Sequence, residues 1–223
     1  MKMKKNVATA IVSGALVGCL AIGGTFAYLT ANSGTVINKF TGAANLDVTI
    51  SETAQPSSNE TYVISEKSDA TKQTDGSYAT GEKASGESGG ITYENVVPGA
   101  EVNKDVDVHV KQNATKSYVF IKIEGLDIDE LDATELQTLD GTWVKIDGTT
   151  TQDGVYALTE EGSLDNLKVV DSSTGDVTLN VFDTINVNAA LTENVTLGNI
   201  TVTAQTVQAN GVDSATAIAQ VNL

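Results

Sequence analysis

The side chains best suited to chemistry in this chain are its single histidine and its many carboxylates. His109 lies in an alternating segment with the same parity as Asp105 and Asp107, which predicts a solvent-facing position on a strand. One histidine cannot supply the His-Glu-x-x-His pair of a zinc protease, and the only cysteine lies near the N-terminus. We therefore expect no catalytic residue, no resident metal and no cofactor.

An acidic cluster is the second candidate, and it consists of Asp127, Asp129, Glu130, Asp132 and Glu135. It lacks the glycine of an EF-hand loop, and Leu131 interrupts it. We interpret the segment 126–139 as one or two short helices on the rim of the domain, with Asp132 or Thr134 as N-cap and the acids in solvent. Calcium shared between subunits is the minor alternative.

The N-terminal residues show the charged, apolar and small side chains of a secretory signal peptide, in that order. Three lysines precede an apolar run over residues 7–22, and Thr25 and Ala27 place small side chains where a signal peptidase needs them. We expect a signal helix and cleavage between Ala27 and Tyr28. A membrane anchor is the alternative, but the run is shorter and richer in Ala and Gly than a span of about 20 strongly apolar residues.

Cys19 raises a second alternative, because residues 16–19 resemble a lipoprotein box whose cysteine is lipidated. The apolar residues 20–22 follow where a lipoprotein normally turns polar, so we favour removal of Cys19 with the leader. The expected mature chain then has no cysteine and no disulfide. We expect no stable membrane anchor.

The net charge of the chain limits the kinds of partner that it can bind. Without the leader, 10 lysines stand against 29 acids, a net charge of −19, and the chain contains no arginine. Such a surface repels nucleic acid and anionic membranes. It suits an extracellular protein that is kept soluble by charge, or one whose charge is screened when it assembles.

The remaining elements are mostly strands. Residues 46–50 alternate between apolar and polar, and similar runs occur at 102–110, 118–123, 143–146, 155–158, 177–182, 185–191 and 200–207. Many short strands separated by turns, with few helices, predict an all-β, jelly-roll-like antiparallel β-sandwich. We expect a signal peptide at 1–27, an N-terminal arm at 28–44 and a sandwich domain at 45–223 with a flexible loop at about 66–90.

Several pairings follow from the order of these runs. The runs 102–110 and 118–123 are joined by a short polar turn, which favours antiparallel pairing between them. The runs 143–146 and 155–158 resemble a hairpin, and residues 215–223 resemble a last edge strand. Pro98-Gly99 predicts a turn.

Three segments resemble the TasA/camelysin family. The first runs from the lysines through Gly-Gly-Thr-Phe-Ala at 23–27 to Asn-Lys-Phe-Thr-Gly-x-x-Asn-Leu-Asp-Val-Thr-Ile at 38–50. The second comprises Asn95 to Val110, Asn113 and Tyr118 to Ile123, and is similar to the family's Pro-Gly block between strands. The third is Ile200 to Gly211, similar to its last strand. Residues 126–195 do not align.

The resemblance implies a jelly-roll sandwich, export through a signal peptidase of the SipW type, and a homopolymeric fibre of the biofilm matrix. It also implies that the arm is donated to the next subunit, with a matrix accessory protein as a further partner. From the residues, the anchors of this donor strand would be Leu29, Val36, Ile37 and Phe40. The alternative is an arm that folds back on its own domain or stays disordered.

Two other functions compete with a fibre subunit. One is a cell-surface adhesin or carbohydrate-binding module, which the single Trp and few Tyr make weaker because sugar sites favour exposed aromatic rings. The other is a camelysin-type secreted metalloendopeptidase, a label that some family members carry. The sequence contains no zinc-ligand set that supports it.

Overall fold

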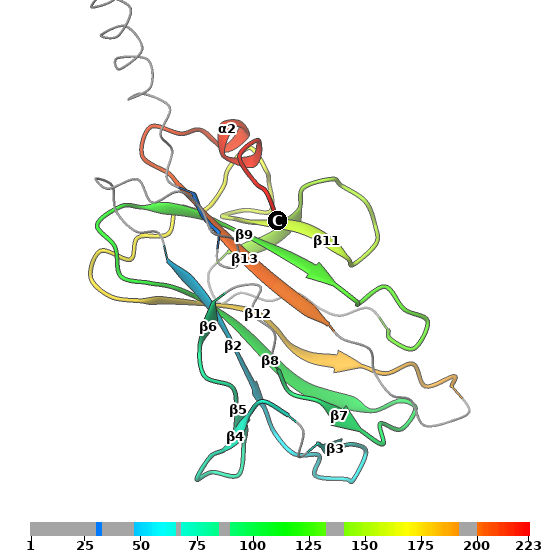
Figure 1. Cartoon of the computed structure of the whole chain (residues 1–223). Coiled ribbons are helices and arrows are strands. Elements are labelled where there is room, and N and C mark those ends of the chain that lie inside the picture. The colour runs from blue at the N-terminus through cyan, green and yellow to red at the C-terminus, as the bar shows by residue number, and fades with distance from the viewer. Residues whose placement is uncertain (1–29, 33–46, 66–67, 85–89, 133–140, 192–199) are drawn as a thin grey trace, which may run out of the picture.

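The protein is a sandwich of two antiparallel β-sheets, which confirms the predicted all-β class (Figure 1). The computed structural model describes residues 30–32, 47–65, 68–84, 90–132, 141–191 and 200–223. The expected signal helix and the sites Ala27, Tyr28, Leu29, Val36, Ile37 and Phe40 lie outside these residues. Within the described part, no helix has the length and apolar character needed to cross a membrane.

The first sheet has five strands. Their order is β1 (Thr30–Asn32), β13 (Thr201–Gln208), β9 (Ser117–Glu124), β11 (Gly154–Thr159) and β10 (Thr142–Lys145). β10 and β11 pair as the predicted hairpin, with Trp143 opposite Leu158. β13 pairs with β9 along its whole length, from Thr201 opposite Glu124 to Gln208 opposite Ser117.

The second sheet faces the first. Its path is β12 (Val177–Asn186), β8 (Glu101–Val110), β2 (Val48–Ala54), β5 (Tyr78–Ala79) and β4 (Thr71–Lys72), and β6 (Lys83–Ala84) also pairs with β2. A separate two-stranded pair joins β3 (Val63–Ile64) to β7 (Tyr93–Glu94). The predicted turn at Pro98-Gly99 follows β7, and Gly99 has the positive φ of 74° that favours glycine there.

Alternation along the strands builds the main core between the sheets. On β8, Val102, Lys104, Val106, Val108 and Val110 are buried, whereas the residues that alternate with them are partly exposed. On β9 the inward side chains are Val119, Ile121 and Ile123. This is the period of two expected when one face of a strand is buried.

A second apolar cluster covers the other face of the first sheet. Tyr118 and Phe120 of β9 join Val207 of β13, Val212 and Ala217 in it. The short helix α2 (Ser214–Ile218) lies against this face (Figure 1), so β9 is buried on both sides.

The prediction of an edge strand at 215–223 was therefore wrong. Asp213 caps α2 by accepting a hydrogen bond from the Thr216 N–H, and Ala217 points into the second cluster. Gln205 holds the residues that follow, because its side chain accepts from the Asn222 N–H at 2.8 Å and donates to the Gln220 carbonyl at 3.3 Å.

The predicted pairing of residues 102–110 with 118–123 was also wrong. These residues form β8 and β9, which lie in different sheets, so the polar turn between them carries the chain across the sandwich. The interval 66–90, predicted as a flexible loop, contains the short strands β4, β5 and β6 in its described parts. They extend the second sheet beside β2.

The second cluster gives a stability prediction. Ala217→Asp places an unpaired carboxylate at a fully buried position and should lower the free energy of unfolding by about 3 kcal/mol. Ala215→Asp, on the exposed side of the same helix, is the matched control and should have little effect. Urea unfolding of both variants measures the difference, and equal stabilities would contradict a role for α2 in covering this face.

Candidate functional site

His109 lies on the outer face of the second sheet, as its parity predicted. Its Nε2 lies 2.8 Å from the Ser51 hydroxyl and its Nδ1 lies 3.1 Å from the Thr178 hydroxyl. Both ring nitrogens thus engage hydroxyl groups of the neighbouring strands β2 and β12. This arrangement ties three strands together.

The acidic cluster at 126–132 forms a loop rather than a helix. Asp153 accepts hydrogen bonds from the N–H groups of Gly125 and Leu126 at 2.9 and 2.7 Å, and Asp127 accepts from those of Gln152 and Asp153 at 2.8 and 2.6 Å. The two carboxylates thus bind each other's loops, which explains why the predicted helix does not form here.

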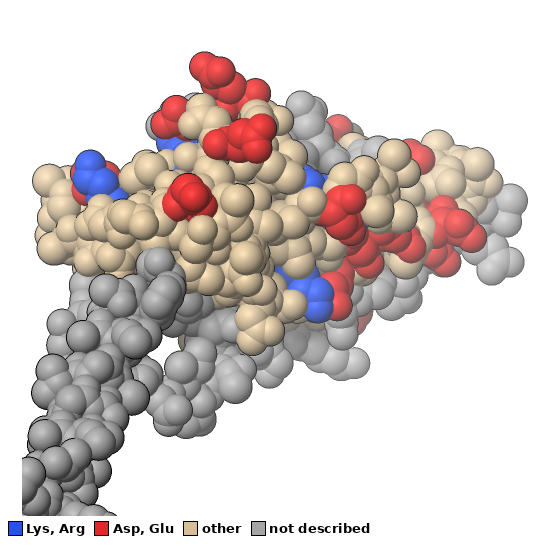
Figure 2. Space-filling view, turned by 90° about the horizontal axis from the view of Figure 1, so that it is seen from above, with Lys and Arg blue, Asp and Glu red and all other residues tan. Residues whose placement is uncertain are grey.

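The remaining residues of the predicted helical segment lie partly inside and partly outside the described residues. The Asp132 N–H donates to the Asn186 carbonyl, and the residues that it or Thr134 would cap, together with Glu135, lie outside the described residues. Among the described residues, no group of three or more His, Cys, Asp or Glu side chains is placed to hold a metal ion. Figure 2 shows acidic residues spread over the face seen there, with several of them grouped toward its right-hand end.

Asp105 and Asp107 share the outer face of β8 with His109. The Asn180 side-chain amide donates to Asp105 at 2.7 Å and lies 3.4 Å from Asp107. Burial, reinforced by the carboxylates of Asp107 and Asp183, raises the pKa of Asp105 to about 6, and the hydrogen bond from Asn180 opposes this rise.

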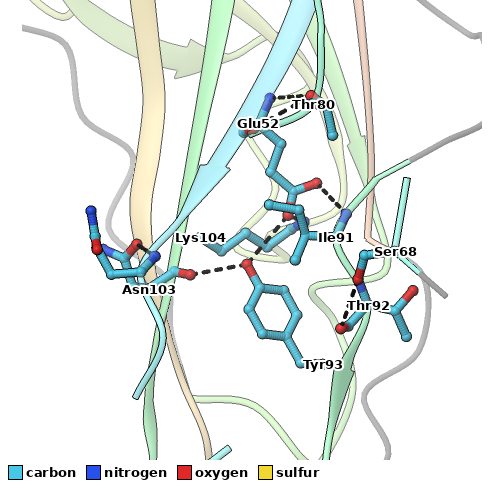
Figure 3. A network of polar contacts seen from close by, with 9 residues as sticks. Glu52, Ser68, Thr80, Ile91, Thr92, Tyr93, Asn103 and Lys104 are labelled. Atoms are coloured by element: carbon cyan, nitrogen blue, oxygen red, sulfur yellow. Dashed lines mark hydrogen bonds and ion pairs between the residues drawn. The ribbon is translucent and has the colours of Figure 1, made fainter. Parts of the chain in front are cut away.

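A buried ion pair between Glu52 and Lys104 occupies the interior of the sandwich (Figure 3). Lys104 is 7% exposed and Glu52 is 8% exposed. Tyr93 stacks its ring 5.7 Å from the Lys104 ammonium, and its hydroxyl donates to the Asn103 carbonyl at 2.9 Å. The pair thereby fixes the segment around β7 to strands β2 and β8.

Sequence reasoning missed this pair, although the signal was present. Lys104 has the inward parity of Val102 and Val106, and Glu52 has that of Val48. Two opposite charges at inward positions of two strands predict a buried pair if those strands are neighbours.

The edge of the first sheet bears on the prediction that the N-terminal arm acts as a strand. β1 pairs antiparallel with β13, with Thr30 opposite Val207, Ala31 opposite Thr206 and Asn32 opposite Gln205. In a single chain, the described part of the arm therefore adds as a strand to its own domain. The donor-strand anchors proposed from the sequence, Leu29, Val36, Ile37 and Phe40, lie outside the described residues.

The other sheet edges in the described part are poorly suited to adding a strand. β10 has four residues and points the buried Lys145 inward, where hydroxyls of Thr149 and Thr151 hold its ammonium at 2.6 Å. β12 is interrupted by two register shifts, and β4 has two residues. Inward charges, bulges and short strands all protect edges from pairing. β13 has eight residues in continuous register with β9.

Comparison of the chain with protein-family models, curated proteins and solved structures found no match.

The raised pKa of Asp105 predicts a pH-dependent stability. The folded state favours the neutral form of the Asp105 carboxyl group over the charged form. The stability that this preference contributes to the folded protein is fully present below about pH 3.8 and is lost as the pH rises through about 6. Asp105→Asn should stabilise the protein near neutral pH by up to about 1 kcal/mol, allowing for solvent screening, with no gain below about pH 3.8. Denaturant unfolding at the two pH values measures this.

Asp171→Asn is the control of opposite sign. Hydrogen bonds from Ser173 and Lys116 lower the pKa of Asp171 to about 2, so its replacement should destabilise the protein near neutral pH. A gain from Asp105→Asn that is equal at both pH values would contradict the assignment to ionisation.

Proposed function

We propose that this protein is a secreted structural subunit of extracellular matrix fibres, and that it assembles by donating its N-terminal strand to the β13 edge of the next subunit. The observation that carries the proposal is this edge. Among the described strands, β13 offers a long edge in continuous register. The strand that pairs with this edge, β1, comes from the N-terminal arm, far from β13 in the sequence. A strand added there gains main-chain hydrogen bonds that an open edge lacks.

Exchange of the arm between subunits requires no new contact. Pairing of β1 with β13 has the same register whether the arm belongs to the same chain or to a neighbour, which is the basis of domain swapping. Fifteen residues separate Asn32 from Val48, and a fully extended segment of that length reaches about 50 Å. The connection is therefore long enough to reach a neighbouring domain. Because donation is head to tail, it produces an open polymer unless the chain of subunits closes into a ring.

The sequence supplies the remaining support. The leader directs the chain out of the cell, and cleavage after Ala27 leaves the arm at the new N-terminus. The segments that resemble the TasA/camelysin family point to the same role, with a SipW-type signal peptidase and a matrix accessory protein as partners. A mature chain without cysteine or a zinc-ligand set favours a structural role over a peptidase.

A single substitution in the arm tests the proposal. Ala31→Pro removes one main-chain donor from the centre of β1, opposite Thr206, and should abolish fibres of the secreted protein in electron micrographs. Ala31→Thr, a residue that strands favour, is the matched control and should form fibres. Deletion of residues 28–39 should also prevent fibres, while circular dichroism shows that the domain remains folded.

Fibres that persist unchanged in Ala31→Pro and in the deletion variant would overturn the proposal. An adhesin or carbohydrate-binding module would then become the better hypothesis.

A further inference from the structure

The buried pair of Glu52 and Lys104 joins two strands of the second sheet. Glu52 lies opposite Val106 in the register of β2 with β8, so Lys104 is its diagonal neighbour on the inward face. The ammonium contacts Oε1 of the carboxylate, and the two groups are screened from water by the sandwich around them. An amine and a carboxyl group are thus held in contact in a dry interior.

The surroundings of the carboxylate distinguish its two oxygens. Oε2 accepts a hydrogen bond from the Ile91 N–H at 3.0 Å, whereas Oε1 faces Lys104 and lies 3.4 Å from the Tyr93 hydroxyl (Figure 3). Burial, with the nearby Glu52 and Tyr62, raises the pKa of Tyr93, so its hydroxyl keeps its proton. One oxygen therefore has a fixed main-chain donor, and the other has a proton carrier beside it.

We propose that Lys104 and Glu52 form an intramolecular amide bond, a covalent link between β2 and β8. The ammonium first passes a proton to the carboxylate that it contacts. The neutral Nζ then forms a bond with the Glu52 Cδ, and the C–Oε1 bond breaks as that oxygen leaves as water. The net reaction converts one ammonium and one carboxylate into one amide and one water, with no oxidant or co-reactant.

Each neighbouring group has a role in this step. The Ile91 N–H stabilises the negative charge that develops on Oε2 and then bonds the amide oxygen. The Tyr93 hydroxyl relays a proton to the departing oxygen. Tyr93 also bonds the Asn103 carbonyl, which positions the hydroxyl beside the pair.

The interior also favours the product. Two buried charges are costly to desolvate, and the amide removes both of them while keeping an acceptor for Ile91. Holding the reacting groups in contact replaces a bimolecular encounter, and effective molarities for such reactions reach about 10⁵ M or more. Exclusion of water limits the reverse reaction.

A second buried lysine in the same chain provides an internal comparison. The Lys145 ammonium is held by hydroxyl and carbonyl oxygens of Thr149 and Thr151, and the Asp147 carboxylate lies 3.8 Å away and is largely exposed to solvent. Among the described residues, this ammonium has no buried carboxyl partner, so we expect Lys145 to remain unmodified.

Intact mass spectrometry of the folded, purified protein tests the proposal directly. The mass should be lower than the sequence mass by one water, about 18 Da, and fragmentation should place the link between Glu52 and Lys104. The full sequence mass would overturn the proposal, as would a loss of water located elsewhere. This result does not depend on whether the protein forms fibres.

Lys104→Arg is the matched control, because it keeps the positive charge but replaces the amine with a guanidinium that stays protonated. It should show the full sequence mass. Tyr93→Phe keeps the ring over Lys104 and removes the hydroxyl, and should lower the linked fraction at early times after synthesis. A loss of water that persists in Lys104→Arg would contradict the assignment to this pair.

Discussion

The structure depends on the burial of β9 on both of its faces. One face contributes Val119, Ile121 and Ile123 to the core between the sheets, and the other packs Tyr118 and Phe120 beneath α2. A strand buried on both faces and paired on both sides cannot lie at an edge, so β13 and β11 must flank it. The edge of the sheet is thereby moved outward to β13, whose outer side the arm covers.

This constraint connects folding with the proposed assembly. The C-terminal residues are held over the first sheet through Gln205, so they stabilise the domain rather than extend the sheet. The N-terminal arm is the segment left to complete the edge, and it is joined to the domain through a connection long enough to reach a neighbour. A subunit without disulfides would gain stability from such pairing, and also from a covalent link within the second sheet.

Alternation in the sequence predicted the fold class, β2, β8, β13 and the β10–β11 hairpin, because a period of two reports which face of a strand is buried. It could not predict that β8 and β9 lie in different sheets, because periodicity does not indicate which strand pairs with which. The helix at 214–218 is too short for its period to be recognised, and packing on Phe120 decides it. Lys104 and Glu52 could be recognised as inward charges, but their pairing required the register of β2 with β8.

Disulfide trapping in assembled fibres tests the central claim, exchange of the arm, most directly. Ala31→Cys and Thr206→Cys place cysteines at opposite positions of β1 and β13, and the natural cysteine, Cys19, lies in the expected leader. After oxidation of washed fibres, non-reducing electrophoresis should show a ladder of disulfide-linked oligomers that collapses to monomer on reduction, and neither single variant should give it. Fibres whose subunits run only as monomers with an internal disulfide would contradict strand donation.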